Sequence, residues 1–423
     1  MFGGTRRSGI QWASRAVSSA LCVWLLAACS ANGPELLPPL PTLPTPDTVQ
    51  ADKKQQQVKV ALLVPLSAQG HSGVIGKSLK QAAELALFER DNDNPAVQLI
   101  VKDDKGTPEG ARTAADEALK SGAKLILGPL FAKSAGAVAP LARQANVPVI
   151  TFSTDRQVAG NGVYLLSFQP APEVARIVTY AVQQGKRRFA ALVPEDAFGK
   201  LAASSFQEAV NRAGGTVVAH ETYPASANGV LEPMRKISAA IQGAEGDGAP
   251  IDALFLPGGQ ENMELIARLL PQAEIDTERV KLIGTGGMDY PNAGRDAPLV
   301  GAWYPGPDPR GWSDFSQKYA KTFGQTPPRI AGLAYDAMTL AIALSAAGEG
   351  QPYSAAQLTR ATGFTGVDGA FRLLPDGSTD RSLAILEVQK FGAGVVEPPS
   401  GLASRPLPAP AGATSALPRP ALN

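Results

Sequence analysis

The sequence predicts an α/β protein of two doubly wound lobes, each with a parallel sheet, joined by a hinge. Eight short apolar runs alternate with helix-length segments whose apolar residues recur at helical spacing. Alternation of strand and helix at this length is typical of a parallel sheet covered on both faces. Eight strands between residues 58 and 284 fit two sheets better than one, although periodicity alone leaves a single barrel open.

The predicted strands follow one another along the middle of the chain. Helical patterns, such as the one formed by Val174, Ile177, Val178 and Ala181, separate them. The strands are expected at residues 58–64, 97–101, 124–127, 147–152, 189–193, 216–222, 251–256 and 280–284.

The two ends of the chain are predicted to lie outside this fold. Basic residues precede an apolar run at 16–26 that is too short to span a bilayer, so residues 1–28 are interpreted as a signal peptide. Residues 29–57 are rich in Pro and are expected to form an extended tether. Residues 392–423, rich in Pro, Ala and Gly, are expected to form a disordered tail.

The signal closes on LLAACS, which resembles the bacterial lipoprotein box. The resemblance implies that Cys29 is the lipidated first residue of the mature chain, and a plain secretory signal is the alternative. Acyl chains hold a protein to a bilayer because each buried methylene contributes about 0.8 kcal/mol. Ser30 fits delivery to the inner leaflet of the outer membrane if the source is Gram-negative.

The stretch VALLVPLSAQGHSGVIGKS, residues 60–78, leads from a strand into a Gly-rich loop. A phosphate loop needs four residues between its two glycines, whereas five separate Gly70 from Gly76. We interpret the glycines as a sharp turn before a helix at 77–90. The free N–H groups at that helix start attract polar groups, so Ser67 and His71 are predicted to line a cleft.

Composition and motifs argue against catalysis and against nucleic acid. With 39 basic and 38 acidic residues, the chain has no strong field to attract nucleic acid. Only two histidines and no cysteine pair in the mature chain leave no His/Cys metal site, and no metal or cofactor is predicted. The acidic pairs Asp103-Asp104 and Glu195-Asp196 are interpreted as solvated strand ends. No complete catalytic constellation occurs, so the protein is predicted not to be an enzyme.

Several short motifs follow one another along the chain in an order that matches a known protein family. They are VALLVPLSA at 60–68, LGPL at 127–130, VPVITFST at 147–154, VPEDAFG at 193–199, AYDA at 334–337 and GFTGVDG at 363–369. Together they resemble the type I periplasmic binding proteins, the Leu/Ile/Val-binding group, over residues 58–390. The resemblance implies two lobes that close on a ligand about a hinge. Lobe 1 is expected at 58–169 and 301–357, and lobe 2 at 170–300 and 358–391.

The resemblance also implies where a ligand is held. The family's amino-acid receptors use a Ser after Gly-Pro, a Thr after the next strand and an aromatic residue in the second lobe. Here Ala132, Thr154 and Phe198 stand at those positions. Ala132 cannot donate the hydrogen bond, and a buried polar ligand left one bond short loses about 1 to 3 kcal/mol. The predicted cleft residues are Ser67, His71, Phe131, Ser153, Thr154, Phe198, Gln260 and Met288.

The stretches LLVPLS at 62–67 and ILGPLF at 126–131 are most similar to lipoprotein activators of penicillin-binding proteins. This similarity implies a lipid-anchored periplasmic regulator of peptidoglycan synthesis whose partner is a penicillin-binding protein. The alternative is a receptor for branched-chain or other amino acids, or another small polar ligand, that serves an ABC permease. An anchor in the outer membrane favours the regulator, because an importer's receptor must dock on the inner membrane.

Overall fold

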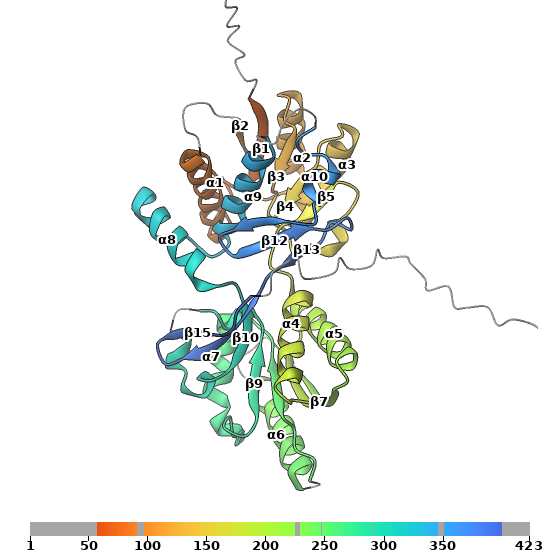
Figure 1. Cartoon of the computed structure of the whole chain (residues 1–423), viewed down its shortest axis with the longest axis vertical. Helices are drawn as coiled ribbons and strands as arrows, with labels where there is room; N and C mark the ends of the chain where they lie inside the picture. Colours follow the sequence, from red (N-terminus) through yellow and green to blue (C-terminus); the bar gives the residue numbers. More distant parts are fainter. Residues whose placement is uncertain are drawn as a thin grey trace, which may run out of the picture. The chain divides into compact units, whose positions relative to one another are not determined.

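The computed structural model describes residues 57–90, 97–224, 229–246, 248–290, 292–345 and 351–399 (Figure 1). The predicted signal peptide, the lipidation site Cys29 and the tether up to residue 56 lie outside the described residues. The same holds for the chain beyond residue 399.

The first lobe is built on a five-stranded parallel sheet in the order β2-β1-β3-β4-β5. Its strands are β1 (Val58–Val64), β2 (Val97–Asp103), β3 (Leu125–Leu127), β4 (Val149–Thr151) and β5 (Val163–Leu165). An apolar core lies against each face of this sheet. One face is covered by α2 (Pro108–Lys120) and α3 (Ala132–Gln144). The other face is covered by α1 (His71–Arg90), α8 (Pro309–Phe323) and α9 (Ala331–Ser345). This is the predicted doubly wound arrangement.

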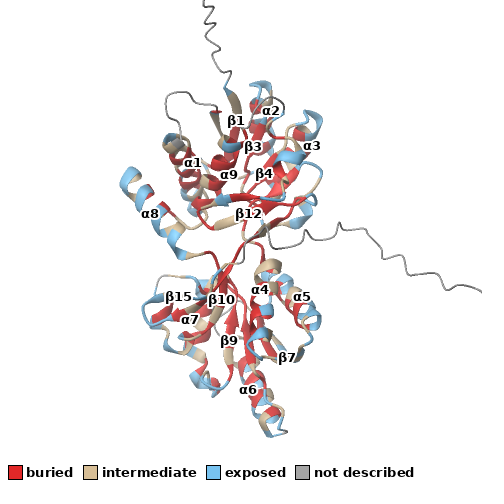
Figure 2. Ribbon diagram, in the orientation of Figure 1, coloured by how far each residue is buried: buried red, intermediate tan, exposed pale blue. Residues whose placement is uncertain are grey.

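The second lobe is built on a seven-stranded sheet in the order β15-β14-β10-β9-β8-β6-β7. The strands are β6 (Arg188–Pro194), β7 (Thr216–Tyr223), β8 (Ala253–Leu256), β9 (Lys281–Gly284), β10 (Trp303–Gly306), β14 (Ala384–Gln389) and β15 (Gly392–Glu397). One face packs on α4 (Pro170–Gln183) and α5 (Ala197–Arg212), and the other on α6 (Leu231–Gly246) and α7 (Gln260–Leu269). The central strands are buried (Figure 2). All eight predicted strands are present, and the predicted α/β fold with parallel sheets is confirmed.

A third, small antiparallel sheet belongs to the core of the first lobe. It consists of β11 (Phe364–Gly366), β12 (Gly369–Leu373) and β13 (Thr379–Arg381), and it follows the short helix α10 (Ala355–Leu358). Phe364, Phe371 and Leu373 pack in the same core as α1 and α9. Of the described residues, lobe 1 therefore contains those between 57 and 169 and between 308 and 381, and lobe 2 contains those between 170 and 307 and between 382 and 399.

These bounds differ from the predicted division at three places. The segment 303–306 was assigned to lobe 1, but it forms β10 between β9 and β14 of lobe 2. The sequence WYPG does not predict this strand, because Pro and Gly are depleted in strands. Residues 358–381 were assigned to lobe 2, but their apolar side chains fill lobe 1. Residues 392–397 were assigned to the tail, but they form β15, which pairs with β14.

The Gly-rich segment within residues 60–78 does not form a phosphate-binding loop. Helix α1 begins at His71 rather than at residue 77. Only Gly70 takes a left-handed conformation, with φ of +64°, and makes the turn. Gly73 and Gly76 lie inside the helix, where a Cβ would overlap the carbonyl oxygens of Ala68 and Pro65. The glycines therefore let the first helical turn pack directly on the loop that follows β1.

Candidate functional site

The predicted cleft residues of lobe 1 share one edge of its sheet, where strands β1, β3 and β4 end. Ser67 is exposed, and its backbone N–H donates to Asp103 Oδ1 at 3.3 Å. His71 is exposed at the first position of α1, and Phe131 is half-buried in front of α3. The structure therefore brings these three residues to one edge, as expected for loops at the carboxyl ends of parallel strands.

The remaining two residues predicted for lobe 1 follow β4. Ser153 is buried, and its hydroxyl accepts from the backbone N–H of Asp155 at 3.1 Å. Thr154 is exposed, while its carbonyl accepts from the Gln169 side chain at 3.4 Å. Ser153 thus shapes the loop, and the Thr154 side chain is the one that solvent reaches.

The interpretation of Asp104 as a solvated strand end is wrong, because Asp104 is fully buried. Its Oδ1 accepts from the Gly106 N–H at 2.8 Å and so fixes the turn after β2. Burial raises the pKa of Asp104 to about 6; the Gly106 hydrogen bond opposes this rise, and the charge of Asp103 adds to it. Folded Asp104 therefore binds its proton more tightly than the unfolded chain does.

From this pKa we expect the native fold to lose stability as pH rises from about 4 to about 6. In Asp104→Asn that part of the pH dependence should disappear. The melting temperature of the variant should therefore rise relative to that of the native chain as pH rises. The measurement is the melting temperature of both chains between pH 4.5 and 7.5. Parallel curves for the two chains would contradict the assignment.

A pocket of about 410 Å³ lies at the carboxyl ends of β6, β8, β9 and β10 of lobe 2 and at the hinge, with Arg329 of lobe 1 also in its lining. Backbone forms much of its wall, through Gly258, Gly259, Gly286 and Gly287. A Cβ on Gly287 would overlap the carbonyl oxygen of Gly258, so the loops after β8 and β9 touch through bare backbone. Such a wall offers peptide N–H and C=O groups to a ligand.

The other walls are largely apolar. Phe198 lines the pocket with 37% of its surface exposed, and this is the predicted aromatic residue of lobe 2. Further apolar lining comes from Phe168, Pro170, Pro305 and Pro307. Apolar walls with a few polar groups are typical of small-molecule sites.

The other two predicted residues of lobe 2 are placed differently. Met288 is only 1% exposed, because its side chain packs in the lobe's core against Gly284, where a Cβ would not fit. Gln260 is exposed at the start of α7, and its amide donates to Glu264 at 2.8 Å. The glycines that precede them, rather than their side chains, line the pocket.

Three carboxylates line the pocket: Glu173 in the first turn of α4, Asp196 before α5 and Asp289 after β9. Asp196 Oδ1 caps α5 by accepting from the Gly199 N–H at 2.6 Å. Glu173 accepts from the Gly286 N–H at 2.9 Å. Burial raises the pKa of Glu173 to about 7, although the Gly286 hydrogen bond and the charge of Arg381 oppose this rise.

Sequence reasoning missed these acidic residues. Asp196 was interpreted only as a solvated strand end, although its place directly after a strand was a usable signal. Glu173 follows two prolines at the start of a helix, and nothing in that pattern separates an ordinary first-turn acid from one in a pocket. Asp289 belongs to the glycine-rich end of β9, which had been singled out for Met288 instead.

A buried charge network lies where the lobe 1 sheets approach the hinge. Asp336 and Asp368 are 1% and 0% exposed, and Arg381 is 4% exposed. Arg381 Nη1 lies 3.9 Å from Asp336 Oδ2, and Arg329 Nη2 lies 2.7 Å from Asp368 Oδ1. Asp336 also accepts from the Val367 N–H at 2.6 Å. Asp336 belongs to the AYDA motif and Val367 to the GFTGVDG motif, so the two motifs make a structural contact with each other.

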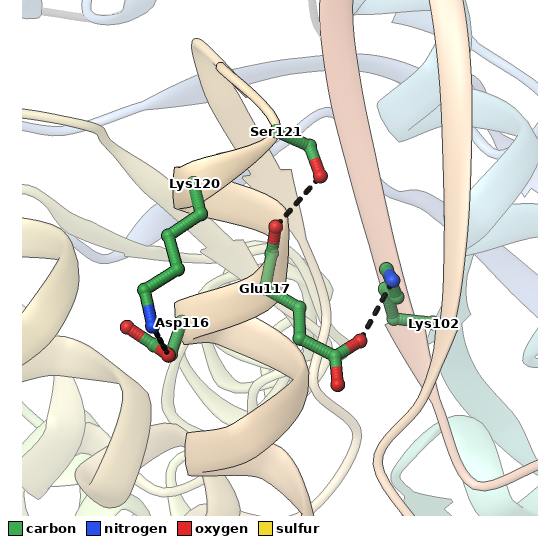
Figure 3. Close-up of polar contacts among 5 residues, drawn as sticks. All are labelled: Lys102, Asp116, Glu117, Lys120 and Ser121. Carbon is green, nitrogen blue, oxygen red and sulfur yellow. Dashed lines mark hydrogen bonds and ion pairs between the residues drawn. The ribbon is translucent and has the colours of Figure 1, made fainter.

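A second hollow, of about 430 Å³, lies on lobe 1 beside α2, and charged and polar residues such as Lys102, Asp103 and Glu117 line it. Figure 3 shows an ion pair between two residues that line it: Lys102 Nζ lies 2.7 Å from Glu117. On the same helix, outside the lining, Lys120 lies 2.6 Å from Asp116. The Ser121 hydroxyl donates to the Glu117 carbonyl at 2.8 Å and closes the helix. This hollow is therefore a weaker candidate than the apolar pocket of lobe 2.

The part of the chain that the structure describes has neither a metal-site cluster nor a membrane-spanning helix. No group of three or more His, Cys, Asp or Glu side chains there has the arrangement of a metal site. In the same part of the chain, every helix is too short or too polar to cross a membrane.

The periplasmic binding protein family model matches residues 57–393, and the chain belongs to this family. A relative in Brucella melitensis, a Leu/Ile/Val-binding protein homologue, is 24% identical over 254 residues, which are 57% of this chain. The match spans 62% of that relative's length.

Solved structures share the fold. A putative branched-chain amino acid ABC transporter protein from Rhodospirillum rubrum is 19% identical, with a TM-score of 0.70 over 80% of this chain and 100% of its own. A solute-binding protein from Rhodopseudomonas palustris, in complex with 3,4-dihydroxybenzoic acid, is 21% identical. Its TM-score is 0.58 over 82% of this chain and 98% of its own. These likenesses confirm the type I binding-protein fold.

Proposed function

We propose that the protein is a non-catalytic periplasmic receptor that binds a small solute and delivers it to an ABC importer. The pocket of lobe 2 carries the proposal, because it combines an exposed aromatic wall, bare backbone and carboxylates at the ends of four parallel strands. The names of the similar proteins favour this function: one is a Leu/Ile/Val-binding protein homologue, one a putative branched-chain amino acid ABC transporter and one a solute-binding protein of an ABC transporter.

The activator of a penicillin-binding protein, favoured from the sequence, has less support. Its evidence is the likeness of two short stretches in lobe 1 and the predicted anchor at Cys29, which lies outside the described residues. None of the relatives reported above is an activator of this kind. Lipid attachment and delivery to the outer membrane remain predictions, and the regulator is retained only as an outcome of the test.

The test is the melting temperature of the purified chain against a solute collection that includes amino acids, aromatic acids, amines and sugars. A ligand at 100 times its Kd stabilises a fold by about 2.7 kcal/mol, so a true solute should raise the melting temperature by about 5 °C or more. A collection without any such solute, together with co-purification of a transpeptidase, would contradict the receptor and support the regulator.

A further inference from the structure

The charge of the lobe 2 pocket is strongly one-sided. Glu173, Asp196 and Asp289 supply three carboxyl groups from three different elements. Because burial raises the pKa of Glu173 to about 7, this group carries part of its charge at neutral pH. Among the described residues that line it, Arg329 alone is cationic. A pocket with this lining attracts positive charge and repels negative charge.

Arg329 does little to offset these carboxylates, because its own charge is engaged elsewhere. Its Nη2 lies 2.7 Å from the carboxylate of Asp368, which is fully buried. Its guanidinium also lies over the ring of Trp312, 4.4 Å from the ring centroid. If Arg329 turned to an anionic ligand, the buried carboxylate of Asp368 would lose this cation and would have no solvent to stabilise its charge.

A second, independent observation points to a ligand. Thr285 lines the pocket and is 1% exposed, yet its hydroxyl has no hydrogen-bond partner among the described residues. Buried hydroxyl groups are normally paired, so an unpaired one beside a cavity is a position where a ligand group can bind. The hydroxyl lies in the loop that also carries Asp289 and the backbone of Gly286.

We propose, on the basis of the receptor function above, that this pocket selects ligands with a protonated amine attached to an apolar body and discriminates against carboxylic acids. The amine lies among the three carboxylates and within reach of Thr285. The apolar body packs against Phe198 and Phe168, whose rings suit both a hydrocarbon and a nearby cation. A ligand carboxylate is not required for binding.

The test uses matched ligands that differ only in charge. For leucine the set is the amino acid itself, 3-methylbutylamine, which lacks the carboxylate, and 4-methylpentanoate, which lacks the amine. Equivalent sets with phenyl and cyclohexyl bodies extend the range of shapes, and the corresponding alcohols provide neutral ligands. Calorimetric titration of the purified chain is expected to give at least tenfold tighter binding of an amine than of the acid with the same body.

Two variants connect the preference to the pocket. Asp289→Asn keeps the size of the side chain and should weaken amine binding at least fivefold while leaving the matching alcohol within twofold. Glu195→Gln removes an equal charge next to Asp196, from an exposed residue that does not line the pocket, and should change neither. An unchanged amine affinity in Asp289→Asn would overturn the inference.

The outcomes also separate this inference from the receptor function. If an acid binds as tightly as its amine, or if the only solutes that bind carry no positive charge, the inference fails and the receptor function stands. If no solute of any charge binds, both fail together.

Discussion

Arg381→Met is expected to lower the free energy of unfolding by about 3 to 5 kcal/mol at neutral pH, which is typical when one partner of a buried ion pair is removed. Arg381 is 4% exposed and lies beside Asp336, and its guanidinium is 5.0 Å from the Phe168 ring centroid. Methionine keeps most of that packing but leaves two buried carboxylates, Asp336 and Asp368, without this cation. The measurement is denaturant unfolding of both chains.

The pH dependence of this loss identifies its cause. Burial raises the pKa of Asp336 to about 7, while the charge of Arg381 opposes the rise. Without Arg381 the pKa rises further, so acid neutralises the carboxylate and the loss should shrink between pH 7.5 and pH 5. The control is Arg212→Met, whose side chain is 65% exposed in a pair with Glu208 and should change stability by less than about 1 kcal/mol. A loss of similar size for both variants, or one that does not depend on pH, would contradict the account.

Gly287→Ala is expected to destabilise the fold by about 3 kcal/mol, at the upper end of overpacking costs, and to abolish solute binding. The added Cβ would overlap the carbonyl oxygen of Gly258, which is backbone and cannot move aside as a side chain would. The loops after β8 and β9 must therefore separate, and both line the pocket. Thermal melting measures the first effect and calorimetric titration the second.

Gly259→Ala is the matched control for this substitution. Gly259 lines the same pocket, but a Cβ there would meet no atom within 4 Å, and its φ of −85° suits alanine. Its stability should stay within about 0.5 kcal/mol of the native chain, as for most unstrained surface changes. Equal losses in the two variants would show that the close contact at Gly287 does not hold the loops together.

The sequence predicts the sheets well because central strands contain short apolar runs, such as VALLV in β1, which are typical of strands buried on both faces. It fails where local signals disagree with tertiary packing. The strand WYPG ends in Pro and Gly, which are depleted in strands, and it forms because the neighbouring strands β9 and β14 pair with it. The residues of β11 to β13 lie far along the chain from lobe 1, and only the long-range burial of Phe371 and Leu373 places them there.

The site was harder to predict than the fold. Phe198 could be placed by resemblance, because it follows a strand within a motif. Glu173 and Thr285 could not, since their importance comes from the burial of one and the unpaired hydroxyl of the other, which depend on segments distant in sequence. Met288 was expected at the cleft because it follows two glycines, but a methionine next to a tightly packed Gly284 fills the core.

Calorimetric titration of the tightest-binding solute into the native chain and into Phe198→Ala and Phe391→Ala tests the receptor function most directly. Phe198 lines the lobe 2 pocket, whereas Phe391 is 89% exposed in the turn between β14 and β15. We predict saturable binding of one solute per chain, at least tenfold weaker in Phe198→Ala and unchanged in Phe391→Ala. Equal affinity in all three chains, or no saturable heat with any solute, would contradict a receptor that binds its ligand in this pocket.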